Sequence, residues 1–143
     1  MKVLIGVMGL GSMLFSLSSA AHELVVQLEN IQSTKGSLLL AVYDKEDSYN
    51  ANRNWVSAQQ VQLVESAIAE GSMKVVLGDL PDGDYAIKLF QDENGNGQID
   101  LNSLGVPVEP YGFSNNAGSF GPPSFDEAKV TLDKATEIRI RLR

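Results

Sequence analysis

The sequence predicts an all-β protein, an antiparallel β-sandwich of about seven strands with one long ordered loop. Seven segments alternate apolar and polar residues with the period of two expected of a half-buried strand, and turn-forming residues separate them. A third observation is the stretch 92–126, which does not alternate and is rich in Gly, Asn, Pro and Ser. A loop of that length inside a compact domain is usually functional or disordered.

Six of the alternating segments are clear and one is weaker. The clear ones are residues 24–28, 38–42, 73–77, 85–89, 128–132 and 138–142, and the weaker one is 61–63. Between the second and third strands in chain order, the stretch "KEDSYNANRNWVSAQQ" predicts a crossover with a short helical turn. Its Trp55 is the sole Trp, and we expect it to cap one end of the core. The alternative is an exposed ring that serves as a binding platform.

The stretch 92–126 carries enough aromatic residues to be packed onto the sandwich. We therefore expect this loop to be ordered. The aromatic residues are Tyr111, Phe113, Phe120 and Phe125.

The first 21 residues, "MKVLIGVMGLGSMLFSLSSAA", have the pattern of an export signal. Lys2 precedes an apolar run over 3–17, and small residues acceptable to a signal peptidase follow. A membrane anchor is the competing interpretation, but the run is broken by Gly and Ser and is short of the roughly 20 residues that a span needs. We expect a signal peptide over 1–21, cleaved after Ala20 or Ala21, and a single periplasmic or secreted domain over 22–143.

The charge balance narrows the range of partners. The chain has 11 Lys and Arg against 18 Asp and Glu, a net charge of −7, which becomes −8 when Lys2 is removed with the signal peptide. Such a charge argues against nucleic acid and anionic membrane surfaces as partners. The absence of Cys excludes thiol chemistry and thiolate metal sites. We expect an unknown protein or polysaccharide partner at the cell envelope and no membrane span after signal cleavage.

The stretch "DENGNGQIDLN", residues 92–102, has the ligand types and spacing of a calcium loop. Oxygen side chains recur at alternate positions, Gly97 stands sixth where a sharp turn is needed, and Ile99 matches the apolar anchor. The twelfth position is Ser103 instead of a bidentate Glu, and a strand precedes the loop, so it is not an EF-hand. The candidate ligands are Asp92, Asn94, Asn96, Gln98 and Asp100.

The competing interpretation of this loop is a plain turn. Asn-Gly steps favour positive backbone dihedral angles after a strand, which explains the glycines but not the acids at both ends of the series. If calcium binds, a missing ligand is expected from Glu93, Glu109 or Asp126.

The sequence gives little support to an enzyme. His22 is the sole His and there is no Cys, so Ser114 has no recognisable base. Paired carboxylates, such as Asp84 with Asp92, remain an alternative. We expect a non-enzymatic binding or structural module. The alternative function is a carbohydrate-binding or hydrolase-like domain that uses loop carboxylates and Trp55. A terminal His22 could also chelate copper, although no second His or Cys would assist it.

Several motifs together resemble a known bacterial family. They are "GSLLLAVYD" and, over 80–128, "LPDGDYAIKLF", "DENGNG", "YGFSNN" and "GPPSF". The chain resembles the bacterial exported family called domain of unknown function 2141. The resemblance implies a secreted or periplasmic antiparallel sandwich, of Ig-like or transthyretin-like type. The segment "LPDGDYAI" is similar to segments of sandwich domains that resemble transthyretin or the regulatory domain of carboxypeptidases. The family often has His directly before the loop Asp, where this chain has Gln91.

Overall fold

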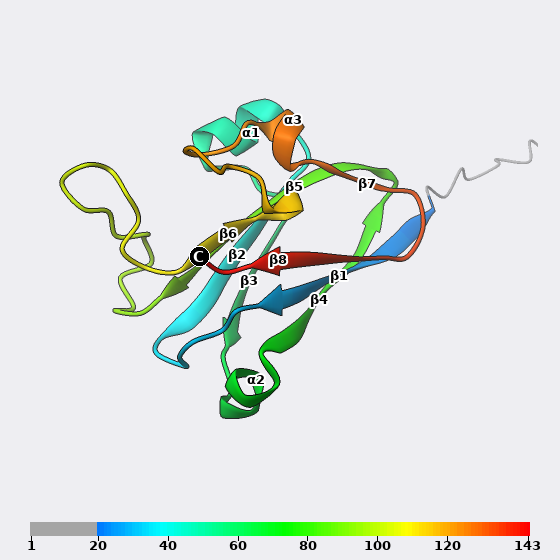
Figure 1. Cartoon of the computed structure of the whole chain (residues 1–143). Helices are drawn as coiled ribbons and strands as arrows, with labels where there is room; N and C mark the ends of the chain where they lie inside the picture. The colour runs from blue at the N-terminus through cyan, green and yellow to red at the C-terminus, as the bar shows by residue number, and fades with distance from the viewer. Residues whose placement is uncertain (1–19) are drawn as a thin grey trace, which may run out of the picture.

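The computed structural model describes residues 20–143, so nearly all of the expected signal peptide lies outside the described residues. Eight strands form two sheets that pack as layers, as Figure 1 shows. The prediction of a mostly β, sandwich-like domain is confirmed. Among residues 20–143, no helix is long and apolar enough to cross a membrane.

The smaller sheet has the strand order β4-β1-β8. The central strand β1 (Ala21–Glu29) runs antiparallel to β4 (Ser72–Pro81) but parallel to β8 (Thr136–Arg141). The expectation of a wholly antiparallel sandwich is therefore wrong at the β1–β8 pair. Apolar alternation does not encode the direction of a neighbouring strand, and the chain enters β8 from a strand of the other sheet.

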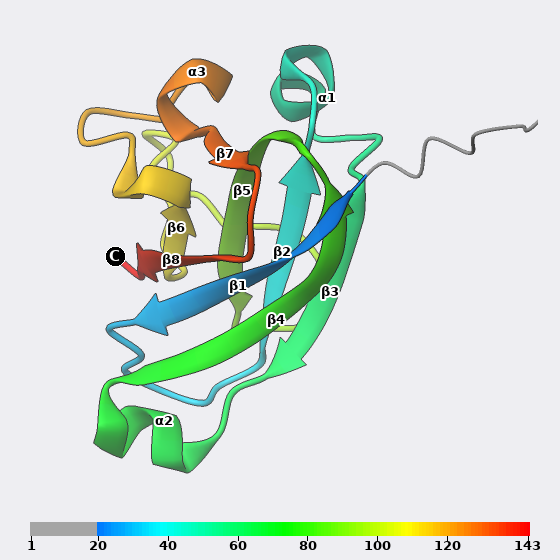
Figure 2. The same ribbon diagram turned by 90° about the vertical axis from the view of Figure 1, so that its right-hand side faces the viewer.

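The larger sheet has the order β3-β2-β5-β6. Its central pair is β2 (Ser37–Tyr43) and β5 (Gly83–Asp92), which run antiparallel. The edge strand β3 (Ser57–Gln62) pairs with β2, while β6 (Tyr111–Phe113) and β7 (Val130–Leu132) pair with β5. Figure 2 shows the smaller sheet in front, with its strands crossing obliquely over those of the larger sheet.

One side of the two layers is closed by backbone hydrogen bonds. The N–H of Tyr111 donates to the carbonyl of Arg143 at 3.1 Å, and the N–H of Arg143 returns a bond of 3.0 Å. Leu142, just beyond β8, donates to Glu29 of β1 at 3.0 Å. The end of the chain thereby joins β6 of one sheet to β1 of the other.

The core between the sheets is formed by the apolar positions of the alternating segments. Removing these side chains from water is the main favourable contribution to folding. The most deeply buried are Leu24, Val26, Leu28, Leu38, Val42, Ile87, Leu132 and Ile140.

The short helices lie outside the two layers (Figure 1). The first, α1 (Glu46–Ala51), confirms the helical turn expected before Trp55. The second, α2 (Glu65–Glu70), was not predicted; it ends at Gly71, whose φ of +76° suits a helix C-terminus. Trp55 is 50% exposed, so the prediction that it caps the core is wrong.

A second apolar cluster, which does not include Trp55, joins α1 and α3 to strands β2 and β5. Tyr43, Tyr49 and Phe125 meet edge to face, with ring centroids 5.7 and 5.8 Å apart. The Nζ of Lys88 lies 3.9 Å from the Tyr49 ring centroid and donates to the Tyr49 carbonyl at 2.6 Å. Burial lowers the pKa of Lys88. Burial, assisted by the charge of Glu127 and by Tyr43, raises the pKa of Tyr49 to about 12.

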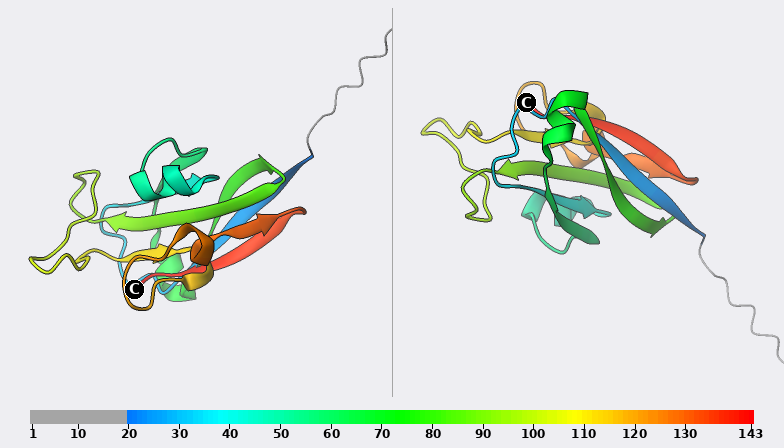
Figure 3. Two further views of the ribbon diagram at one scale, coloured as in Figure 1. Left: turned by 90° about the horizontal axis from the view of Figure 1, so that it is seen from above. Right: turned by 90° about the horizontal axis from the view of Figure 1, so that it is seen from below.

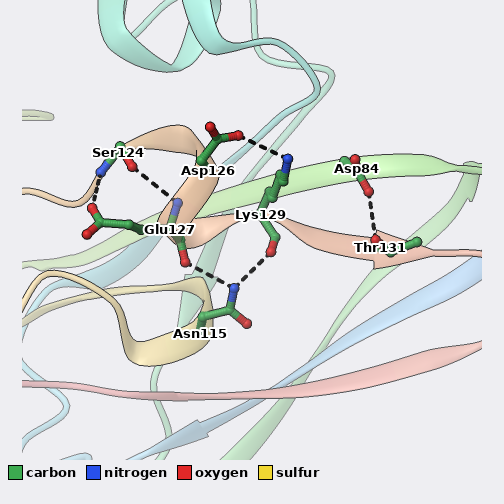
Figure 4. A network of polar contacts seen from close by, with 7 residues as sticks. All are labelled: Asp84, Asn115, Ser124, Asp126, Glu127, Lys129 and Thr131. Atoms are coloured by element: carbon green, nitrogen blue, oxygen red, sulfur yellow. Dashed lines mark hydrogen bonds and ion pairs between the residues drawn. The ribbon is translucent and has the colours of Figure 1, made fainter.

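The second half of the stretch 92–126 contains regular structure that alternation did not reveal. It includes β6, the 3-10 turn η1 (Ser114–Asn116) and the start of α3 (Phe125–Ala128). A capping box joins Ser124 and Glu127 at the start of α3, and the Asn115 amide donates to the Glu127 and Lys129 carbonyls (Figure 4). These bonds hold η1 against α3.

The aromatic residues of this stretch behave differently from one another. Phe125 is buried, and Tyr111 and Phe113 are partly buried with their rings in edge contact. Phe120 is fully exposed, so the expectation that it packs the loop is wrong. The aromatic residues that pack the stretch 92–126 onto the sandwich are instead Tyr111, Phe113 and Phe125.

Candidate functional site

Asp92 is the last residue of β5 and begins the candidate calcium loop. Its side chain is only 4% exposed. One carboxylate oxygen, Oδ2, accepts the backbone N–H of Gly97 at 2.8 Å. The other, Oδ1, is buried and has no hydrogen-bond partner. A buried carboxylate oxygen without a partner is costly, and a bound cation is one way of satisfying it.

The asparagines fold the loop around Asp100. The Asn94 amide oxygen accepts the N–H of Asn96 at 3.2 Å, and the Asn96 amide oxygen accepts the N–H of Gln98 at 3.0 Å. The amide nitrogen of Asn96 donates to Asp100 at 2.9 Å, and that of Asn94 donates to the second Asp100 oxygen. The structure therefore brings together Asn94, Asn96 and Asp100, as the spacing predicted. Gln98 contributes its backbone N–H here, while its side chain is exposed.

Glu109 closes the loop from a position nine residues beyond Asp100. Its buried carboxylate accepts the N–H of Glu93 at 2.7 Å and the N–H of Asp100 at 2.8 Å. Of the three residues considered as a further ligand, Glu109 is thus bonded through its carboxylate to the backbone of the loop. Asp126 instead pairs with Lys129 at 3.0 Å beside α3 (Figure 4).

The connection between β1 and β2 packs beneath this loop, which the sequence did not predict. Gln91 is buried, and its amide nitrogen donates to the carbonyls of Ser33 and Lys35 at 3.2 and 2.8 Å. Gly36, at φ +69°, lies so close that a Cβ there would be 1.9 Å from the Asp92 carbonyl oxygen. A glycine in a turn was visible in the sequence, but its proximity to Asp92 follows only from the β2–β5 register.

Two combinations of residues considered as alternatives lie apart: Asp84 with Asp92, and the carboxylates of residues 92–102 with Trp55. Asp84 and Asp92 stand at opposite ends of β5, about 26 Å apart at the usual rise of a strand, so they are not paired carboxylates. Asp92 lies opposite Ser37, whereas Val56 bonds to Val42 at the far end of β2. Trp55 is therefore at the other end of the sheet from residues 92–102.

The remaining polar candidates have structural partners. Ser114 is fully buried, accepts the N–H of Ile87 at 2.9 Å and donates to the Ala128 carbonyl. His22 Nε2 lies 3.0 Å from a carboxylate oxygen of Asp82, which belongs to the β4–β5 turn. Each thus ties two segments of the fold together.

The chemistry of the loop suits a hard cation. Over residues 20–143, no group of three or more His, Cys, Asp or Glu side chains is placed to hold a metal ion. The loop offers a different set of oxygens: the carboxylates of Asp92 and Asp100, with the amides of Asn94 and Asn96. Calcium accepts carboxylate, amide and backbone oxygens, whereas zinc and copper favour nitrogen and sulfur.

The fold and the loop define a class: a small sandwich-like β domain with an acidic, asparagine-rich loop at the end of a central strand. The chain belongs to the family described as "Uncharacterized protein conserved in bacteria (DUF2141)", whose model matches residues 26–139. This match confirms the predicted family, and it covers the whole loop. Searches of curated proteins and of solved structures found no match.

Proposed function

We propose that the protein is an exported, non-enzymatic binding or structural module whose loop 92–102 is organised by calcium. The observation that carries the proposal is the buried, unpartnered Oδ1 of Asp92 at the entrance of a loop made of oxygen ligands. Asp92, Asn94, Asn96 and Asp100 would hold the ion, with Gln98 as a further oxygen source. Calcium would neutralise carboxylates that otherwise repel each other.

Hydrogen bonds within the loop hold part of its conformation without metal. Gly97 donates to Asp92, and the asparagine amides donate to Asp100. Calcium would replace the amide N–H donors at Asp100. The Asn94 and Asn96 oxygens, which accept the N–H groups of Asn96 and Gln98, would have to turn toward the ion to serve as ligands. The loop's stability is thus expected to depend on the metal, while the two sheets provide the frame.

The proposed location is the periplasm or the exterior of the cell, after cleavage behind Ala20 or Ala21. Strand β1 begins at Ala21, so either cut leaves its pairing with β4 intact from His22 onward. The two sheets and the β4–β5 hairpin that carries "LPDGDYAI" support placing the domain with Ig-like or transthyretin-like sandwiches. The partner is proposed to be a protein or polysaccharide of the cell envelope.

A second candidate function is carbohydrate binding by Trp55 alone. The half-exposed ring favours it, because stacking on a sugar needs an accessible aromatic face. Since Trp55 is the sole Trp, its fluorescence reports such binding directly. A saturable change on adding envelope polysaccharide would support this function, and an unchanged spectrum would exclude it for that polysaccharide.

Thermal unfolding tests the proposed calcium loop. A ligand that binds only the folded state, at about a hundredfold excess over its dissociation constant, adds about 2.7 kcal/mol of stability and several degrees to the melting temperature. The melting temperature should therefore be higher in millimolar calcium than in chelator, with a smaller rise in magnesium. Asp92→Asn with Asp100→Asn should abolish the rise. The matched control, Asp79→Asn with Asp133→Asn, removes two exposed carboxylates elsewhere and should preserve it.

A further inference from the structure

Directly after the calcium loop, the chain forms a protruding hairpin over 101–108, which we call the tip. Its sequence, "LNSLGVPV", contains no charged residue in a chain whose net charge is −7. Leu101 and Pro107 form an antiparallel bridge at its base. In Figures 1 and 3 the tip belongs to the yellow-green loop that projects away from both sheets.

The tip presents four aliphatic side chains to solvent. Leu104 is 85% exposed, Val108 60%, Leu101 54% and Val106 51%. Single exposed aliphatic residues are common on soluble proteins, but several on one short projection mark an interaction site.

The tip is a defined hairpin because the Asn102 side chain organises its turn. The Asn102 amide oxygen accepts the N–H groups of Leu104 and Val106 at 2.9 and 3.1 Å. Gly105 donates its N–H to the Asn102 carbonyl at 3.0 Å. The exposed aliphatic side chains are thus carried by a hydrogen-bonded turn.

Most backbone N–H groups of the tip donate hydrogen bonds to acceptors close by in the chain. Asn102 donates to the Val106 carbonyl at 2.8 Å, Val108 donates to the Asp100 carbonyl at 2.9 Å, and Pro107 has no N–H. Five of the seven N–H groups over 101–108 therefore have partners within residues 100–108. Few N–H groups are left for a partner that adds a strand, so contact through the exposed side chains is favoured.

Charge decides which lipid surface suits the tip. Asp100 and Glu109 flank its base, and the whole chain is acidic, so anionic headgroups would repel it. A zwitterionic surface carries no such penalty. A convex, uncharged projection also matches insertion better than stacking on a flat polar surface.

We propose that the tip inserts its aliphatic side chains into the surface of a zwitterionic lipid bilayer and so holds the domain against a membrane. The contact is weak and reversible, because four partly exposed side chains contribute less apolar area than a single acyl chain, which itself gives only marginal binding. The tip's hydrogen bonds include no metal ligand side chain, so this contact is independent of calcium.

Co-sedimentation with phosphatidylcholine vesicles tests the proposal. The exported protein, freed of its signal peptide, is compared with Leu104→Asn combined with Val106→Thr, in chelator. Losing two apolar anchors should weaken partitioning at least tenfold. The matched control is Val76→Thr, which changes a side chain 52% exposed on β4 and should partition like the unmodified protein.

Two outcomes would overturn the proposal. One is that the unmodified protein stays in the supernatant at millimolar lipid. The other is that the tip variant, with an unchanged melting temperature, sediments as well as the control. Photo-crosslinking from position 104 in intact cells provides an independent readout: crosslinks to lipid support insertion, and crosslinks only to a protein contradict it.

Discussion

A carboxylate oxygen of Glu109 lies 2.8 Å from the backbone nitrogen of Asp100, although the two residues are nine apart in sequence. The other oxygen of the same carboxylate accepts the N–H of Glu93 at 2.7 Å. One buried side chain therefore holds both arms of the loop 92–102 and the base of the tip. The ordering of this end of the molecule depends on it.

Replacing Glu109 by Gln should loosen both arms. The amide can accept only one of the two backbone N–H groups, and it turns an N–H donor toward the other. Leaving a buried donor unsatisfied costs about 1–3 kcal/mol. Hydrogen exchange at the Glu93 and Asp100 amides should accelerate. The control Glu127→Gln alters an exposed capping carboxylate and should leave that exchange unchanged; unaltered exchange in the Glu109 variant would contradict the anchoring role.

Replacing Gly36 by Ala should displace the start of the loop 92–102. The new Cβ would lie 1.9 Å from the Asp92 carbonyl oxygen, in addition to the strain of a positive φ. Strain and overpacking together predict a loss of roughly 3 kcal/mol, measured by urea unfolding. Gly71→Ala is a matched control, with φ +76° and nothing within 4 Å of its Cβ. Equal losses in the two variants would show that the contact with Asp92 is unimportant.

Stability should fall in alkaline solution because of Tyr49. Its pKa is raised to about 12 in the folded protein, mainly by burial, whereas an unfolded tyrosine ionises near 10. Between about pH 10 and 12 the folded state therefore binds more protons, and the free energy of unfolding falls as pH rises. Tyr49→Phe should reduce this slope in urea unfolding experiments. A slope identical to that of the unmodified protein would contradict the burial of the hydroxyl.

The exported protein should begin at Ala21 or His22. Small residues precede both junctions, and Lys2 leads an apolar run of the kind that signal peptides have. Intact-mass measurement distinguishes the two starting points. Membrane-embedded material that retains Met1 would overturn the signal peptide and restore the anchor.

The strands were predictable because period-two alternation reflects burial on one face. Strands β1, β2, β4 and β5 contain the whole of the segments expected from that pattern, and β8 contains all of its segment except Leu142. Strand β7 covers only 130–132 of the expected segment 128–132, because Ala128 belongs to α3. The parallel pairing of β1 with β8 was not predictable, since an alternating strand presents the same buried face to a neighbour of either direction. Strand β6 was missed because three residues, one of them Gly112, are too few to show a period.

The site was predictable only where it is local. Asn94, Asn96 and Asp100 meet because they lie within one turn of chain, and the spacing of ligand types revealed that. Glu109 and Gly36 reach the loop through long-range pairing, which composition and spacing do not report. Spacing in the sequence also left the pairing of Asp84 with Asp92 open. Their separation follows from β5 being extended.

Isothermal titration of calcium into chelator-treated protein tests most directly whether residues 92–102 bind calcium. If the loop binds calcium, the titration gives saturable heat with one site per chain, a weaker response to magnesium, and no heat of binding in the variant Asp92→Asn with Asp100→Asn. The control Asp79→Asn with Asp133→Asn should bind as the unmodified protein does. Heat no larger than that of dilution, at millimolar calcium, would show that residues 92–102 form a hydrogen-bonded turn and not a calcium site.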